Sequence, residues 1–201
     1  LVGTSALLSS CGKKTANAPL REAGTYYIPN LADKADNGKE IRLGVVGCGG
    51  RGSGAAENVF AAADGVKLVA LGDTCADRLN GLREELKVNR GQEIPDENCF
   101  IGFDAFKKVI DSGIDYVILA TPPAFRPEHY KYAVEKGVHC FLEKPVCVDP
   151  KGYRTVMAAA KQAQAKNLVT VCGTQRHHQR EYVEAFQKIS EGIIGEITGG
   201  N

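Results

Sequence analysis

The stretch VVGCGGRGSG, residues 45–54, decides the fold. It places Gly47, Gly49 and Gly52 in the spacing G-x-G-x-x-G, after the apolar run 41–47 and before a segment with a helical pattern. The first glycine permits a tight turn, the second lets the backbone approach a pyrophosphate, and the third allows close packing of the helix. The amino end of that helix then faces the anion. The pattern predicts the strand, turn and helix that open a dinucleotide-binding domain.

An acidic residue follows where such a domain binds ribose. Asp73 ends the apolar run 66–73, about twenty residues after the last glycine. A carboxylate there accepts hydrogen bonds from the ribose hydroxyls and repels a 2′-phosphate, which favours NAD over NADP. Arg51 and Arg78 keep NADP open as an alternative. The predicted cofactor-binding residues in this part are Gly47, Gly49, Gly50, Arg51, Gly52 and Asp73.

Short apolar runs alternate with helical segments along the chain. The runs are 41–47, 66–73, 116–123, 138–143 and 168–173. They are rich in Val, Ile and Leu without strict alternation, which is typical of strands buried on both faces of a parallel sheet. Between them lie helix start and stop signals, at Asp104 and Gly113, Pro127 and Gly137, and Asp149 with Pro150. The pattern predicts an α/β fold with a Rossmann-like doubly wound parallel sheet.

Two of these runs end in segments that we expect to border the ligand, because ligands lie beyond the carboxyl ends of the strands in such sheets. One is ATPP, residues 120–123, and the other is EKP, residues 143–145. A methyltransferase that binds S-adenosylmethionine also uses a glycine loop and an acid, but has no requirement for EKP. The lone His129 is interpreted as a packing or surface residue.

The glycine loop, Asp73, ATPP and EKP, in this order and spacing, resemble the N-terminal half of the Gfo/Idh/MocA oxidoreductases, the family of glucose-fructose oxidoreductase and inositol dehydrogenase. The resemblance covers about residue 41 to the end. The stretches ATPPAFRPEHY, EKPVCVDPKGYR and GTQRHHQREY are similar to a bacterial subgroup of predicted dehydrogenases that are often exported.

The resemblance implies that the ends of these strands line the nicotinamide. Lys144 would be the catalytic residue, contacting both cofactor and substrate, and a lysine ammonium there can hydrogen-bond the reacting hydroxyl and stabilise developing alkoxide charge. Glu143 would hold Lys144 in place. Further implied cofactor contacts are Thr121, Pro122, Pro123, Glu143 and Lys144, and Gln175 with Arg176 would lie at the nicotinamide and substrate entrance. His177 and His178 stay unassigned, and no metal site is predicted.

The function that the resemblance implies is an NAD-dependent oxidoreductase acting on a CH–OH group of a sugar, polyol or sugar derivative. One alternative is an NAD-dependent glycoside hydrolase that oxidises its substrate transiently and eliminates the glycosidic bond. Another is a non-catalytic nucleotide-binding module. The family's aspartate and histidine, four residues apart in a second domain, are expected beyond residue 201.

The composition gives no case for a nucleic-acid partner. The 25 basic and 24 acidic residues leave a formal net charge of +1, too small for electrostatic attraction to nucleic acid or a membrane surface. The seven cysteines show neither a CxxC pair nor metal-ligand spacing with histidine. Six of them are predicted to be small buried hydrophobic residues.

Cys11 is the exception among the cysteines. It ends an apolar stretch in LVGTSALLSSCGKK, residues 1–14, that resembles the back half of a bacterial lipoprotein signal, in which the cysteine is lipidated. This predicts a lipid anchor and a location in the bacterial cell envelope or periplasm. A tail with an accidental cysteine, in a cytoplasmic protein, is the alternative.

Three segments are expected. Residues 1–40 are interpreted as a truncated signal and linker, 41–175 as the NAD(P)-binding domain, and 176–201 as the incomplete start of an α+β substrate domain. In this last part we expect a helix at about 180–192 and the beginning of a strand in IIGEITGGN. The resemblance implies that the full-length protein forms a homo-oligomer through the substrate domain.

Overall fold

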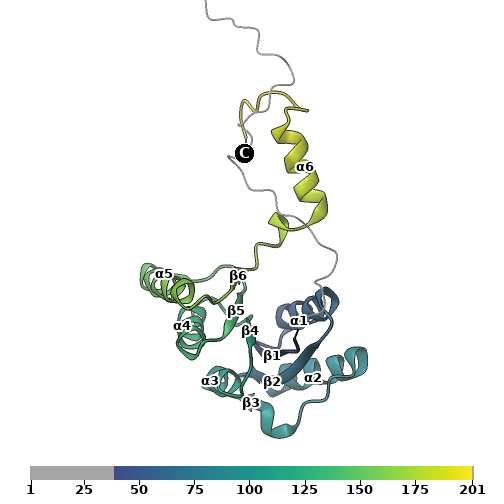
Figure 1. Cartoon of the computed structure of the whole chain (residues 1–201), viewed down its shortest axis with the longest axis vertical. Helices are drawn as coiled ribbons and strands as arrows, with labels where there is room; N and C mark the ends of the chain where they lie inside the picture. Colours follow the sequence, from purple (N-terminus) through teal and green to yellow (C-terminus); the bar gives the residue numbers. More distant parts are fainter. Residues whose placement is uncertain (1–38, 201) are drawn as a thin grey trace, which may run out of the picture. The chain divides into compact units, whose positions relative to one another are not determined.

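A computed structural model describes residues 39–200. They fall into two compact units, one ending at Thr174 and the other beginning at Gln175. The first contains a six-stranded sheet in the order β3-β2-β1-β4-β5-β6 (Figure 1), and every neighbouring pair of strands is parallel. This is the strand order of the doubly wound dinucleotide-binding fold, so the predicted fold class is confirmed.

The strands are short and match the predicted runs closely. They are β1 Ile41–Val46, β2 Val66–Asp73, β3 Cys99–Ile101, β4 Tyr116–Leu119, β5 His139–Leu142 and β6 Thr170–Cys172. The strand β3 was not among the predicted runs, because three residues give no readable period. The run 116–123 leaves the sheet at Leu119, so residues 120–123 form a loop beyond the strand end.

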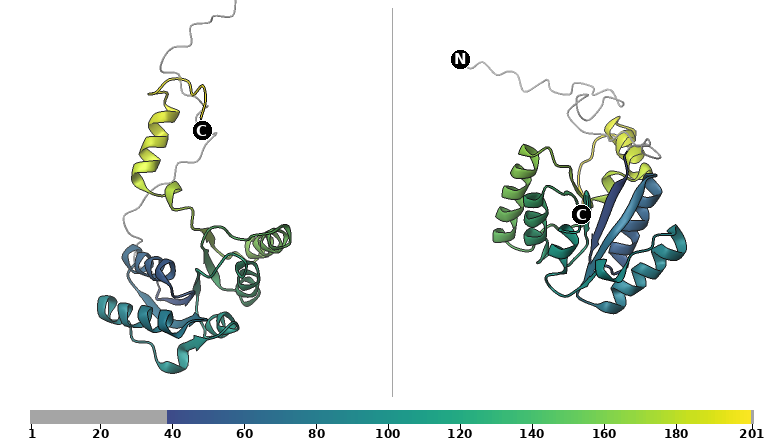
Figure 2. Two further views of the ribbon diagram at one scale, coloured as in Figure 1. Left: turned by 180° about the vertical axis from the view of Figure 1, so that it is seen from behind. Right: turned by 60° about the horizontal axis from the view of Figure 1, so that its bottom comes forward.

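Helices cover both faces of the sheet (Figures 1 and 2). The helices α1 Gly50–Ala62 and α2 Ala76–Arg90 lie on one face, and α3 Ala105–Ile110, α4 Arg126–Lys136 and α5 Pro150–Ala165 lie on the other. Two of the predicted helix-end residues are confirmed as caps. Gly137, in the left-handed conformation, ends α4, and the Asp149 carboxylate caps the start of α5 by accepting the Gly152 N–H at 2.5 Å. A short 3-10 helix, η1 Asp96–Asn98, precedes β3.

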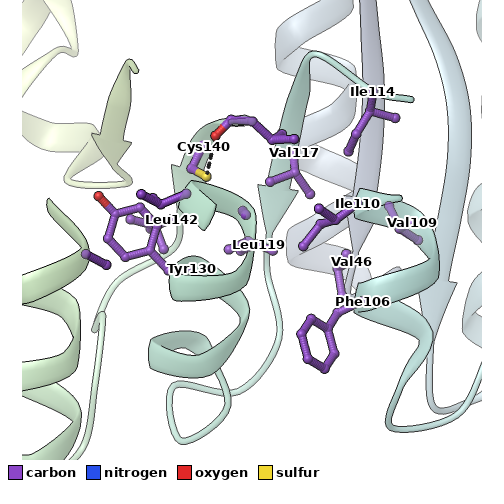
Figure 3. Packing of buried hydrophobic residues seen from close by; sticks show 14 of the residues in the cluster. Val46, Phe106, Val109, Ile110, Ile114, Val117, Leu119, Tyr130, Cys140 and Leu142 are labelled. Atoms are coloured by element: carbon purple, nitrogen blue, oxygen red, sulfur yellow. Dashed lines mark hydrogen bonds between the residues drawn. The ribbon is translucent and has the colours of Figure 1, made fainter. Parts of the chain in front are cut away.

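The sheet separates two apolar cores. In β4, Ile118 belongs to the core beneath α1 and α2, while Val117 and Leu119 belong to the core beneath α3, α4 and α5. Figure 3 shows this second core, where Tyr130 and Leu142 pack beside the central strands. Because both faces of each central strand are buried, the strands read as continuous apolar runs, as the sequence indicated.

The second unit consists of the 3-10 helix η2 Gln175–His177, the helix α6 Arg180–Ser190 and a turn region after it. The expected strand in residues 193–200 does not form, so that prediction was wrong. A strand requires a paired neighbour, whereas the Gly195 N–H bonds the Gly192 carbonyl at 2.9 Å and closes a local turn. The interpretation of this unit as the start of a substrate domain stays a prediction.

Two further findings concern the described residues as a set. None of their helices is both long and apolar enough to cross a membrane. The cysteines between residues 39 and 200 are all free thiols. Only Cys48 and Cys140 are fully buried. The prediction of six buried cysteines was therefore wrong for Cys75, Cys99 and Cys172, which lie at helix or strand ends, and for Cys147, which lies in the loop between β5 and α5.

Candidate dinucleotide site

The turn after β1 is built so that two of its glycines admit no side chain. Gly47 has φ +94°, and a Cβ there would lie 2.7 Å from the backbone carbon of Ala120 and the nitrogen of Thr121. A Cβ on Gly52 would lie 1.8 Å from the Gly47 carbonyl oxygen. The first turn of α1 is therefore pressed against the loop that enters it, and the glycine loop also lies against the loop after β4.

The other side of the turn is open. A Cβ on Gly50 would meet no atom within 4 Å, and one on Gly49 would meet only the Cδ of Arg78, at 3.7 Å. The first amides of a helix have no acceptor within the helix, and they carry partial positive charge. Uncovered backbone next to such amides fits the pyrophosphate of a dinucleotide, which Gly49, Gly50 and Arg51 would hold.

Asp73 lies at the end of β2 and is 8% exposed. One carboxylate oxygen accepts the Cys48 N–H of the glycine loop at 2.6 Å, and the other accepts the Cys75 N–H at 2.9 Å. A carboxylate oxygen has two lone pairs, so both oxygens can still accept ribose hydroxyls. Asp73 thus already joins the glycine loop to the end of β2. Burial, with the Asp73 charge as a lesser cause, raises the pKa of the Cys48 thiol to about 12, so this thiol stays protonated.

An ion pair connects the glycine loop to the end of β5. The Nε of Arg51, in the first turn of α1, donates to the Glu143 carboxylate at 2.7 Å. The Glu143 side chain is 3% exposed and that of Arg51 is 45% exposed. Gly173 provides the room, because a Cβ there would lie 2.7 Å from the same carboxylate oxygen. Arg51 therefore has a structural partner in addition to the cofactor role predicted for it.

The structure changes the predicted relation between Glu143 and Lys144. The second Glu143 oxygen accepts the backbone N–H of Lys144 at 3.2 Å, and the carboxylate pairs with Arg51 instead of with the lysine ammonium. Lys144 is exposed, and it precedes Pro145 through a cis peptide bond. Glu143 thus fixes the backbone of Lys144, and the lysine is exposed beyond the carboxyl end of β5.

The ATPP loop rests on His129, whose ring belongs to an aromatic stack. The Thr121 hydroxyl lies 3.2 Å from His129 Nδ1, and the His129 ring stacks on Phe106 with centroids 4.0 Å apart. Burial, followed by the charge of Arg126, lowers the pKa of His129 to about 4. His129 is therefore neutral near pH 7 and acts as a packing residue, in line with its interpretation from the sequence. Pro122 and Pro123 follow Thr121 in the same loop.

Sequence reasoning missed one buried residue at this edge, Arg126. It is the first residue of α4 and 4% exposed. Its guanidinium donates to the carbonyl of Thr121 at 2.5 Å and to the carbonyl of Pro145. An arginine before a proline at a helix start has no recognised pattern, so no sequence signal could have identified it.

Two predicted residues lie in the second compact unit. Gln175 and Arg176 belong to η2, and the Arg176 guanidinium lies over the Tyr182 ring at 5.5 Å from its centroid. Their predicted place at the nicotinamide entrance stays a prediction. Cys11 lies outside the described residues. Between residues 39 and 200, no three His, Cys, Asp or Glu side chains come together as a group that could hold a metal ion.

Strand order, glycine turn and buried acid together define a dinucleotide-binding Rossmann domain. Residues 41–172 match the Gfo/Idh/MocA model, described as an oxidoreductase family with an NAD-binding Rossmann fold. The chain belongs to this family. The matched residues form its NAD-binding domain, and NAD is the cofactor of that domain.

Three known proteins illustrate the relationship. Inositol 2-dehydrogenase 4 of Saccharopolyspora erythraea is 31% identical over 78% of this chain and 43% of its own length. A glycosyl hydrolase family 109 protein of Shewanella pealeana is 26% identical over 96% of the chain and 42% of its own length. The crystal structure of scyllo-inositol dehydrogenase from Lactobacillus casei, with bound NAD(H) and scyllo-inositol, superposes with a TM-score of 0.64 at 27% identity, over 79% of this chain and 43% of that one. The chain thus spans less than half the length of these proteins.

Proposed function

We propose that the protein is an NAD-dependent oxidoreductase that acts on a CH–OH group of a sugar, polyol or sugar derivative. The observation that carries this proposal is Lys144, an exposed lysine at the carboxyl end of β5 whose backbone is fixed by Glu143 while its ammonium has no ion pair among the described residues. The inositol dehydrogenases among the relatives support a polyol as substrate.

The arrangement of the site suggests a role for the cofactor and for each group of residues. NAD, when bound, supplies hydride transfer at its nicotinamide ring. Gly49, Gly50 and the first turn of α1 would bind the pyrophosphate, and Asp73 would accept the ribose hydroxyls. Lys144 would hydrogen-bond the substrate hydroxyl and stabilise the negative charge that grows on its oxygen as the proton leaves. A proton acceptor for that step would come from the second domain that the family resemblance implies.

The test is an assay of the full-length protein with NAD and a panel of inositols, other polyols and free sugars, following NADH absorbance. We expect NADH to form with at least one polyol and the Lys144→Met variant to lose about a hundredfold or more in rate, the lower range for removing a general acid–base group. The matched variant Lys151→Met, at an exposed lysine of α5, should retain the rate. An unchanged rate in Lys144→Met would refute the role of this lysine, and a wild-type protein that binds no dinucleotide would refute the oxidoreductase.

A second candidate is an NAD-dependent glycoside hydrolase. The observation in its favour is the similarity to the glycosyl hydrolase family 109 protein, which extends over 96% of this chain. Such an enzyme would oxidise the sugar transiently, eliminate the glycosidic bond and reduce the product again, so no NADH would accumulate. Release of nitrophenol from nitrophenyl glycosides without net NADH would support the hydrolase, whereas NADH formation from free polyols supports the dehydrogenase. If the protein binds a dinucleotide but shows neither activity, the result would favour the third alternative, a non-catalytic nucleotide-binding module.

We propose further that the protein is exported and lipidated at Cys11, with a location in the bacterial cell envelope. The support is the pattern of residues 1–14, an apolar stretch that ends in Ser-Ser-Cys-Gly. Incorporation of labelled palmitate that is lost in Cys11→Ser tests the anchor, and recovery of the unlabelled wild type in the cytoplasmic fraction would reject it. A homo-oligomer of the full-length protein is proposed on the family resemblance, and size-exclusion chromatography with light scattering tests it.

A further inference from the structure

Arg126 connects the two loops that the proposed function places beside the nicotinamide. One guanidinium nitrogen, Nη2, donates to the carbonyl of Thr121 in the ATPP loop, and Nη1 donates to the carbonyl of Pro145 in the EKP loop. The two carbonyls are separated by a whole helix and strand in the sequence.

The contact holds the backbone on both sides of the catalytic candidate. The N–H of Lys144 is bonded to the Glu143 carboxylate, and the carbonyl of the next residue, Pro145, is bonded to Arg126. The lysine side chain thus starts from a main chain that is tied at two successive points. Rigid support of this kind is what a reactive group needs in order to be held within a fraction of an ångström of its productive position.

The arginine is an unfavourable choice for stability alone. It is 4% exposed, it forms no ion pair among the described residues, and its Nε has no hydrogen-bond partner there. Burial lowers the pKa of Arg126, while the nearby Glu143 charge, already paired with Arg51, opposes that effect. Burying a charged side chain without a counter-ion costs free energy, which its hydrogen bonds must offset. A group that stability does not require, at the meeting point of two site loops, points to a functional reason.

We propose that Arg126 is a positioning residue for Lys144, which fixes the EKP loop against the ATPP loop and so sets the nicotinamide end of the site. The inference rests on the proposed function, since only a bound dinucleotide gives these two loops a common ligand. It separates the site into two parts. The pyrophosphate and adenosine end depends on the glycine loop and Asp73, and only the nicotinamide end depends on Arg126.

Paired ligands test this separation in the full-length protein. NADH reaches both ends of the site, whereas ADP-ribose keeps the adenosine and pyrophosphate that bind Asp73 and the glycine loop but lacks the nicotinamide ring. Arg126→Met should weaken NADH binding about tenfold, equivalent to one hydrogen bond to a charged group, and change ADP-ribose binding less than about twofold. Arg126→Lys, which retains the charge and one reachable carbonyl, should fall between wild type and Arg126→Met. Arg154→Met, at an exposed arginine of α5, is the matched control and should bind both ligands as wild type does.

The ligand pair also separates a positioning role from a role in folding. If Arg126→Met and Arg126→Lys lose both ligands to the same extent, Arg126 supports the fold and the proposal fails. If neither variant weakens NADH binding, the proposal fails as well. A wild-type protein that binds ADP-ribose and NADH while the variants behave in either of these ways leaves the proposed function intact. A wild-type protein that binds neither ligand refutes the proposed function itself.

A double-mutant cycle tests whether Arg126 acts through Lys144. If it does, the variant Arg126→Met/Lys144→Met should bind NADH no more weakly than the weaker of the two single variants. The same non-additivity is expected in kcat with the polyol substrate. Losses that add in both measurements would show that Arg126 acts independently of Lys144 and would overturn the proposal.

Discussion

The glycine loop after β1 and the EKP loop after β5 lie at the same edge of the sheet, yet different forces hold them. The glycine loop is held by backbone packing so close that no side chain fits at Gly47 or Gly52. The EKP loop is fixed by buried charge, since Glu143 bonds Arg51 and Arg126 bonds the Pro145 carbonyl. The glycine loop is held by close packing of backbone, both within the loop and against residues 120 and 121, whereas the EKP loop is held by charged side chains, one of which joins residues as far apart as 51 and 143.

This difference has a functional meaning for the proposed enzyme. The pyrophosphate end needs bare backbone with a fixed shape, which glycine and a helix start provide. The nicotinamide end needs a charged side chain in a defined position, and polar contacts hold it there while leaving the ammonium exposed. Substitutions should therefore destabilise the two ends differently. At the pyrophosphate end the cause should be steric strain, and at the nicotinamide end it should be a buried charge left without its partner.

The largest effect is expected at the glycine loop. Gly52→Ala would place a Cβ 1.8 Å from the Gly47 carbonyl, a backbone atom that cannot rotate away. We expect a loss of more than about 3 kcal/mol in the free energy of unfolding, at the upper end for overpacking, together with loss of NADH binding. Urea unfolding and NADH fluorescence measure the two effects.

Gly54→Ala is the matched control in the same helix. A Cβ there meets only a terminal nitrogen of Arg51, at 3.8 Å. Since glycine within a helix costs about 0.5–1 kcal/mol relative to alanine, this variant should be at least as stable as wild type and still bind NADH. Equal behaviour of the two variants would mean that strain does not hold the loop.

The histidine that packs under the ATPP loop, His129, should make the free energy of unfolding depend on pH. The unfolded chain protonates His129 near its ordinary pKa of 6.5, but the folded chain does so only near 4, because burial and Arg126 lower the pKa. Between these values the unfolded state binds the extra proton, so stability falls as the pH drops from about 6.5 to about 4. The contribution of this group is up to about 3 kcal/mol.

Urea unfolding of wild type and His129→Gln across this range measures that contribution as a difference. The variant should lose less stability than wild type on acidification. Thr121→Val, which removes the hydroxyl partner but leaves the imidazole in place, should keep the wild-type pH dependence. Parallel curves for wild type and His129→Gln would show that the folded state protonates this histidine normally.

Much of the fold and the glycine end of the site was predictable from the sequence, because the relevant signals are local. The glycine spacing, the acid that ends β2 and the caps of α4 and α5 each lie within a few residues of the element they define. The strand β3 was not predictable at three residues, and the expected strand near the end of the chain could not be judged without knowing its pairing partner.

The charged half of the site was only partly predictable. EKP identified Lys144, and the sequence suggested that Glu143 holds Lys144 in place; in the structure Glu143 bonds the Lys144 backbone, but its charge pairs with Arg51, which the sequence did not indicate. The partner of a buried charge depends on which loops meet at the edge of the folded sheet, here those after β1 and β5 with β4 between them, and neither motif contains that information. Arg126 was missed for the same reason, because its two acceptors are backbone carbonyls that any residue could supply.

A smaller and asymmetric effect is expected from the ion pair between Arg51 and Glu143. Arg51→Met leaves a carboxylate that is 3% exposed without its partner, whereas Glu143→Gln leaves an arginine whose side chain is 45% exposed and can be hydrated. We expect losses of about 2 kcal/mol for Arg51→Met and about 1 kcal/mol for Glu143→Gln. The double variant should lose less than the two losses together. Urea unfolding measures all three, and an equal or reversed order would contradict the buried position of Glu143.

The smallest effect on stability is expected at Lys144 itself, although it is the residue on which the proposed chemistry depends most. Its ammonium has no ion pair among the described residues, and its contacts to Glu143 are made by the backbone, which Lys144→Met leaves intact. An exposed substitution of this kind should change the free energy of unfolding by less than about 0.5 kcal/mol, as Lys151→Met should. NADH binding by the two variants then distinguishes them, because only Lys144→Met should bind more weakly. A large loss of stability in Lys144→Met would instead make the lysine part of the support of the EKP loop, and the contrast between a fixed backbone and a freely presented ammonium would no longer hold.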